Sequence, residues 1–172
     1  MRRCCVAILA LTVWAASGPV VVAKVATIPL AELVDHAEFI GIVRVERLGW
    51  RLPLLKRPRA TARILESWKG PTEGTVTFVA AAAWTCDISE AKKGEEAVVF
   101  IRARNLEHSG RGRMPIFVRE GRRFAAVWPD VRLPQGMVTE AGPEPEFRFI
   151  VGVSIDSLRD AVAAGAAKTD LK

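Results

Sequence analysis

The sequence contains no tyrosine, only two histidines and only three cysteines. Proteins that bind single-stranded nucleic acid stack bases on aromatic side chains, so the lack of tyrosine disfavours that function despite a net charge of +6. No CxxC or HExxH spacing occurs, and there is no glycine-rich phosphate loop. His36 and Glu38 are close in sequence, but no other histidine or cysteine completes a ligand set. We therefore expect no metal site, no cofactor and no nucleic-acid partner.

The chain begins with the features of an export signal. Arg2 and Arg3 supply positive charge, residues 6–16 form an uncharged apolar run, and small residues follow a Gly-Pro pair. We predict that residues 1–23 are cleaved and that the protein is periplasmic or extracellular, with no transmembrane span in the mature chain. Residues 4–23 together reach the roughly 20 residues that a membrane-spanning helix needs, so an uncleaved anchor is the alternative.

Cleavage at this point would leave Cys86 as the only cysteine. It could then form no intrachain disulfide, and we predict a buried structural thiol in a monomer, with an intermolecular disulfide as an open alternative. A thiol enzyme with Cys86 as nucleophile would need His36 or His108 as its base. Asp87 disfavours a thiolate beside it through like charge. We therefore expect no catalytic residues and no enzyme activity.

Three strand-like runs between Glu38 and Ala82 organise the rest of the chain. Residues 39–46 and 60–68 each alternate in the two-residue period of a β-strand, and residues from Thr75 onward are rich in Thr, Val and Phe. The Lys69-Gly70-Pro71 turn, in which Gly70 is a structural residue, separates the second run from the third. These runs predict a mainly β fold that closes into a small barrel of about five main strands. Its expected buried layers include Trp68, Val79, Val99 and Ile101, with Phe100 facing the opposite way.

Other elements complete a single predicted domain over residues 24–165. An apolar helical face predicts a short helix over 29–37, and Gly121 marks a hairpin between 114–120 and 122–128. Further predictions are a polar loop over 104–113, an irregular excursion over 129–145, a strand over 146–153, a Ser154-capped helix to 164 and a frayed tail over 166–172.

Several segments resemble a known family. They read LAELVDHAEFIGIVRVERL, ATARILESWKG, TVTFV and GEEAVVFIRA, with Cys86 between the last two. Over residues 29–128 the chain resembles exported bacterial proteins with a netrin-like domain, the OB-type barrel shared with tissue inhibitors of metalloproteinases. In those inhibitors a cysteine at the mature N-terminus approaches the zinc of the target. The predicted mature chain begins at Lys24 without a cysteine, so the resemblance implies the fold but not this inhibitory mechanism.

The positive charge is concentrated in one region. Residues 44–63 contain seven basic side chains against one acidic, a local charge of +6, whereas the predicted mature chain carries +4 once Arg2 and Arg3 are removed. Such a concentration creates a local field that attracts anions, although a solvated loop is the alternative interpretation. The candidate binding residues are Arg51, Lys56, Arg57, Arg59 and Arg63.

These observations predict a non-enzymatic extracytoplasmic binding module. Its expected partner is an unidentified protein or an anionic component of the cell envelope, contacted through the barrel face and the basic loop over residues 51–59. The alternatives are a thiol-dependent enzyme that uses Cys86, and an inhibitor of metalloproteases that acts without an N-terminal cysteine.

Overall fold

The computed structural model describes residues 27–49, 58–80, 90–106, 111–142 and 150–169. Most described residues lie in strands, with a short helix near the start and a longer helix at the end, which confirms the predicted mainly β class. None of the helices in this part of the chain is long and apolar enough to cross a membrane. The elements are β1 (Ile28–Pro29), α2 (Leu30–His36), β2 (Phe39–Leu48), β3 (Arg59–Lys69), β4 (Thr75–Val79), β5 (Glu96–Arg102), β6 (Asn105–Leu106), β7 (Arg113–Arg119), β8 (Arg122–Val127), β9 (Val131–Arg132), β10 (Thr139–Ala141), β11 (Val151–Ser154) and α3 (Ile155–Thr169).

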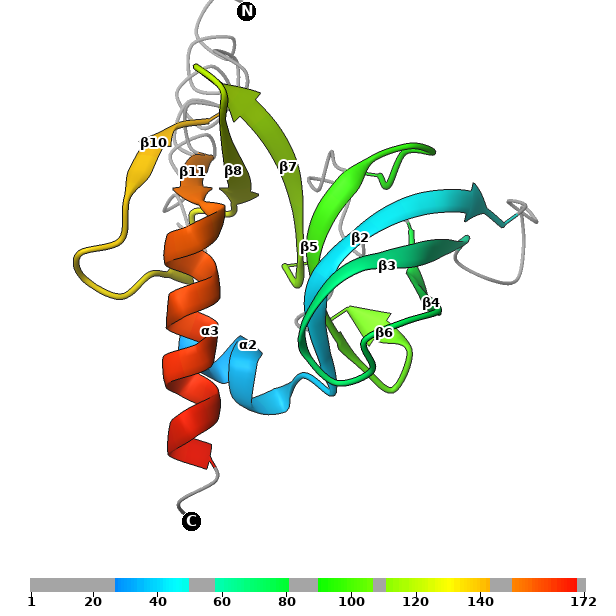
Figure 1. Ribbon diagram of the computed structural model, residues 1–172, viewed down its shortest axis with the longest axis horizontal. Helices are drawn as coiled ribbons and strands as arrows, with labels where there is room; N and C mark the ends of the chain where they lie inside the picture. Colours follow the sequence, from blue (N-terminus) through cyan, green and yellow to red (C-terminus); the bar gives the residue numbers. More distant parts are fainter. Residues whose placement is uncertain (1–26, 50–57, 81–89, 107–110, 143–149, 170–172) are drawn as a thin grey trace, which may run out of the picture.

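One antiparallel sheet dominates the structure. Its strand order is β10-β11-β8-β7-β5-β2-β3-β4, with β6 beside β5, and a separate parallel pair joins β1 to β9. The sheet does not close, so the predicted barrel is wrong in this respect. Figure 1 shows the arrangement: β2, β3, β4 and β6 curl together in one half, while β7, β8 and β11 lead away towards α3. The strands therefore serve two separate cores instead of one barrel interior.

The two cores lie on opposite faces of the central strands β2 and β5. On one face, Ile40 and Phe100 pack with α2, α3 and the strands β7, β8 and β11. On the other, Val99 and Ile101 pack inside the curled half of the sheet. Phe100 thus faces opposite to its two neighbours, as predicted. Burial on both faces explains why β5 is an almost continuous apolar run, since neither of its faces meets water.

The pairing of β2 with β3 departs from the predicted alternation. The register shifts at three points along the pair, and one of them lies at Leu65, because Ile64 is opposite Val43 whereas Glu66 is opposite the adjacent Ile42. An extra residue of this kind is a β-bulge, and it reverses which face the following side chains occupy. Ile64 accordingly packs against the core of the curled half, while Trp68 packs against the other core, which includes residues of α2 and α3. The predicted alternation over 60–68 is therefore wrong beyond Leu65.

The inward face of β4 also differs from the prediction. Phe78 is fully buried, whereas Val79, which was assigned to the core, is half-buried. Val76 and Ala80 lie in the same core as Phe78. The inward residues are therefore the even-numbered ones, and the adjacent Val79 must face outward because strand side chains alternate.

A cap begins helix α3, and a glycine lets it approach helix α2. The backbone N–H of Ser157 donates to the Ser154 hydroxyl at 3.5 Å, which confirms Ser154 as the N-terminal cap of α3. The helix continues to Thr169, so the predicted end at 164 is too early. At Gly165 an added Cβ would lie 3.0 Å from a methyl of Val34, so glycine here permits α2 and α3 to approach closely.

The later segments contain more regular structure than predicted. The hairpin of β7 and β8 turns at Glu120-Gly121, as expected from Gly121. The predicted polar loop contains the short strand β6, which forms a hairpin with β5. The predicted excursion contains β9 and β10, and β10 becomes one edge of the main sheet beyond β11.

A polar cluster fixes α3 to β3. The Arg159 guanidinium donates to both carboxylate oxygens of Glu66, at 2.7 Å from Nε and 3.2 Å from Nη2. The Trp68 Nε1–H donates to the same carboxylate at 2.9 Å, and the Arg159 guanidinium lies 5.8 Å from the centre of the Trp68 ring. Burial opposes ionisation of Glu66, but these hydrogen bonds and the positive charge of Arg159 outweigh it and lower the pKa of the carboxyl.

The lowered pKa of Glu66 predicts a pH-dependent contribution to stability. A carboxyl with a depressed pKa in the folded state contributes fully above its usual value of about 4.5, and the contribution is lost as pH falls through the folded value. The pair is partly exposed, so we expect Glu66→Gln to lower the free energy of unfolding by no more than about 1 kcal/mol at pH 7. Urea unfolding followed by tryptophan fluorescence should show this difference shrinking below pH 4.5. A difference that stays constant down to pH 3 would contradict the prediction.

Candidate functional site

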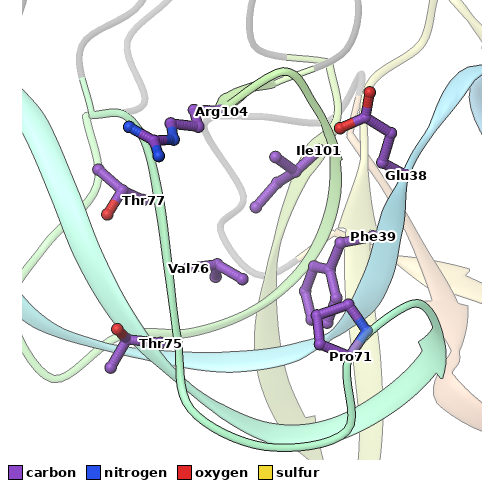
Figure 2. Close-up of a pocket in the computed structure, with 8 residues that line it drawn as sticks. All are labelled: Glu38, Phe39, Pro71, Thr75, Val76, Thr77, Ile101 and Arg104. Carbon is purple, nitrogen blue, oxygen red and sulfur yellow. The ribbon is translucent and has the colours of Figure 1, made fainter.

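A slot lies in the curled half of the sheet, between strand β4 and the turn that joins β5 to β6. Strand β4 approaches β6, yet the described residues contain no ladder between them. The slot has a volume of about 480 Å³, within the range of small-ligand sites. Figure 2 shows the lining side chains around this space. They are Glu38, Phe39, Pro71, Thr75, Val76, Thr77, Ile101 and Arg104.

The floor of the slot is apolar. Phe39, Val76 and Ile101 come from β2, β4 and β5, and all three belong to or pack against the core of the curled half. The slot therefore opens onto the edge of a hydrophobic core, where a bound apolar group would remain in contact with buried side chains. Removing such a group from water would favour its binding by about 25 cal/mol per Å² of apolar surface.

One lip of the slot is an unusual turn. Ala103 and Arg104, which join β5 to β6, have positive φ angles of 47° and 63°. Two such residues in a two-residue hairpin are typical of a type I′ turn, which normally uses asparagine or glycine. Non-glycine residues pay a conformational cost in this region, and such conformations occur often at functional sites.

Neighbouring groups hold this turn in place. The Glu38 carboxylate accepts the Ala103 N–H at 3.1 Å, and Arg59 Nη1 donates to the Arg104 carbonyl at 3.0 Å. The Asn105 side chain donates to the Ala103 carbonyl at 3.2 Å. These contacts use the backbone of Arg104 and leave its guanidinium at the slot, on the side of Thr77 (Figure 2). Within the described part of the chain, that guanidinium has no ion pair.

The other lip is the outer edge of strand β4. The N–H groups of Ile64 and Ala80 donate across the β3–β4 pair to the carbonyls of Gly74 and Pro58, at 3.0 and 2.8 Å. Antiparallel pairing alternates, so even-numbered positions of β4 bond to β3 and the backbone groups of Thr75, Thr77 and Val79 point away from it. No strand among the described residues pairs with that side of β4.

The predicted basic loop is only partly placed. Arg51, Lys56 and Arg57 lie outside the described residues. Arg59 lies at the start of β3 and contacts the Arg104 carbonyl, so it supports the lip of the slot. Arg63 lies further along β3 and forms an ion pair with Glu46 at 3.1 Å.

The other predicted residues lie away from the slot or outside the described chain. Cys86 and His108 fall outside the described residues, and His36 is exposed at the end of α2. Trp68 belongs to the Glu66–Arg159 cluster. Gly70 has a positive φ of 89°, and an added Cβ would lie 2.6 Å from the Glu38 carbonyl oxygen. Glycine at this position therefore allows the β3–β4 turn to pass close to the start of β2.

Arg104 was not predicted as a site residue, because its signal in the sequence is weak. The residue lies in a segment that was predicted to be a polar loop, and its turn lacks the glycine or asparagine that marks a tight hairpin. Ala103-Arg104 does separate the apolar strand β5 from Asn105-Leu106, and this short spacing is the one available indication of a hairpin.

No group of histidine, cysteine, aspartate or glutamate side chains in the described ranges is arranged to hold a metal ion. Comparison with protein-family models, curated proteins and solved structures yields no match.

Proposed function

We propose that this chain is an exported, non-enzymatic binding domain, and that the slot between β4 and the β5–β6 turn is its ligand site. The ligand class is an anion with an apolar body. The apolar part would cover Phe39, Val76 and Ile101, while the acidic group would accept hydrogen bonds from Arg104.

One observation carries this proposal: Arg104 lines an apolar-floored slot from a turn of two positive-φ residues. An ordinary solvated arginine needs no such conformation, because a relaxed loop would expose it equally well. The Glu38 and Arg59 side chains both bind the turn's backbone, so the turn is positioned independently of the arginine side chain.

The basic character of the chain is consistent with an anionic ligand. Arg59, one of the predicted binding residues, lies next to the slot and adds positive charge to the same region. Concentrated charge of one sign raises the local concentration of oppositely charged ligands and accelerates their association. The predicted leader supports an extracytoplasmic location for this binding.

The proposal predicts charge-selective binding of a simple probe. Hexanoate should shift the backbone NMR signals of Val76, Thr77 and Ile101, and hexanamide, which has the same shape without the charge, should bind more weakly. A hydrogen bond to a charged group contributes about 1.5–3 kcal/mol, and solvent exposure reduces this contribution. Arg104→Gln should therefore weaken hexanoate binding about tenfold.

The matched control is Arg102→Gln. Arg102 is also exposed and lies two positions away, but it does not line the slot. We expect it to leave hexanoate binding within about twofold, the range that screening of one surface charge outside the slot allows. Equal losses for the Arg102 and Arg104 variants would show that net charge alone attracts the probe, and the proposed site would be wrong.

A further inference from the structure

We infer that the ligand of the slot carries an ammonium group in addition to its acidic group, and that its apolar body separates the two charges. In this arrangement the acidic group binds Arg104 and the ammonium group binds the Glu38 carboxylate. The inference rests on the proposed function, because it assigns a second contact to the ligand of the same slot.

Glu38 and Arg104 place opposite charges at different ends of the slot. Both side chains line the slot, and both residues are exposed. Figure 2 shows them on either side of Ile101, with the Arg104 guanidinium on the side of Thr77 and the Glu38 carboxylate at the other end. A simple anion would interact favourably with Arg104 alone, and Glu38 would repel it. A ligand with one charge of each sign, held apart, matches both ends.

The position of Glu38 is set by its neighbours. Its backbone N–H donates to the Ile101 carbonyl at 2.8 Å. Its carbonyl oxygen lies against Gly70, where an added Cβ would be only 2.6 Å away. Its carboxylate accepts the Ala103 N–H at 3.1 Å, which orients the side chain. A group that is already positioned loses little conformational freedom when a ligand binds, so Glu38 is suited to recognition.

The hydrogen bonding of Glu38 favours an ammonium over other cations. The bond from the Ala103 N–H uses Oε2, and a carboxylate has about four acceptor sites, so acceptor capacity remains. A guanidinium binds a carboxylate best through both oxygens and would compete with this bond. An ammonium is a compact charge that can donate to one oxygen. It can therefore bind Glu38 without displacing the turn that carries Arg104.

The test uses the full isotope-labelled chain at pH 7 and three probes with the same carbon chain. They are hexanoate, 6-aminohexanoate with its ammonium at the far end, and 2-aminohexanoate with its ammonium beside the carboxylate. From the NMR signals of Val76, Thr77 and Ile101 we expect 6-aminohexanoate to bind about three- to fivefold tighter than hexanoate, the gain that an exposed ion pair allows. The isomer 2-aminohexanoate should bind no tighter than hexanoate, because its adjacent charges cannot reach both ends.

Variants of the two charged residues separate their roles. Glu38→Gln keeps an oxygen that can accept the Ala103 N–H, and it should abolish the advantage of 6-aminohexanoate without weakening hexanoate. Arg104→Gln should weaken both probes by a similar factor and preserve that advantage. The matched control is Glu140→Gln, since Glu140 is exposed on β10 and does not line the slot. It should leave the advantage unchanged.

The inference is overturned if 6-aminohexanoate binds the unmodified chain no better than hexanoate, or if its advantage survives Glu38→Gln. An equal loss of the advantage in the Glu140 variant would also overturn it, because net charge would then attract the ammonium. If 2-aminohexanoate binds most tightly, the two charges bind side by side and the separated arrangement is wrong. In each of these cases the proposed function stands as long as hexanoate binding depends on Arg104. If no probe shifts the slot signals, both proposals fail.

Discussion

Replacing Glu95 by alanine should lower the free energy of unfolding by about 3–5 kcal/mol, the largest effect we expect from one substitution of a charged residue. Glu95 lies just before β5 and forms an ion pair with Arg113 of β7. The Arg113 side chain is only 3% exposed and that of Glu95 13% exposed. Loss of the carboxylate would remove a counter-charge that lies against a buried guanidinium, and an ion pair is far more costly to break at a buried position than at an exposed one.

A matched exposed pair supplies the control. Glu46 and Arg63 form an ion pair at 3.1 Å, but their side chains are 47% and 55% exposed. Glu46→Ala should therefore cost no more than about 1 kcal/mol. The double variant Glu95→Ala with Arg113→Met should recover much of the loss, since it removes the buried charge as well. Urea unfolding provides all of these values, and equal losses for Glu46→Ala and Glu95→Ala would refute the distinction.

Gly41→Ala should destabilise the protein by about 3 kcal/mol, at the upper end of the cost of overpacking. A Cβ at this position would overlap the carbonyl oxygen of Glu66 and lie 3.1 Å from the Cα of Ser67. Both are backbone atoms of β3 next to its bulge, so neither can move away as a flexible side chain would. The substitution therefore strains the β2–β3 pairing on which both cores depend.

Gly49→Ala is the corresponding control. It lies at the end of β2, and an added Cβ would be 3.2 Å from the Arg59 carbonyl oxygen without overlapping it. We expect a loss below about 1 kcal/mol, as for most substitutions outside a packed core. The test is the free energy of unfolding of the two variants, measured side by side. If Gly41→Ala were tolerated as well as Gly49→Ala, the proposed role of the bulge would be contradicted.

The sequence correctly predicted those parts of the fold whose signal is local. The alternation in β2, the apolar face of α2, the Ser154 cap and the hairpin at Gly121 each depend on a few neighbouring residues. The bulge at Leu65 depends on how β3 fits its partner strand, and nothing within β3 alone marks it. For the same reason, Phe78 and Val79 could not be assigned to the correct faces without the register of β4.

Closure of the sheet is a property of distant segments. Whether β4 and β6 pair depends on the curvature that β2 and β5 impose. Strands β2 and β5 are each buried on both faces. The sequence predicted a barrel because the same alternating strands occur in closed and open sheets. The resemblance to netrin-like domains stays a prediction, and so does a binding role for Arg51, Lys56 and Arg57.

The candidate site illustrates the same limit. Arg59 was predicted to contact a ligand because it belongs to a basic segment; this stays a prediction, and its Nη1 donates to the Arg104 carbonyl in the neighbouring turn. Arg104 belongs to no charge cluster in the sequence, and only the three-dimensional arrangement places it on the slot beside Thr77. An arginine in such a position becomes recognisable only once the three-dimensional arrangement of its turn is known.

The central claim is that the slot binds an anionic ligand through its apolar floor. Intermolecular nuclear Overhauser effects between hexanoate and the methyl-labelled protein test it most directly. We predict contacts from the hexanoate chain to the methyl groups of Val76 and Ile101. Val118, at 67% exposed the most accessible large apolar side chain among the described residues, should show none. Contacts to Val118 instead of Val76 and Ile101 would contradict the account, because the probe would then bind wherever apolar surface is exposed.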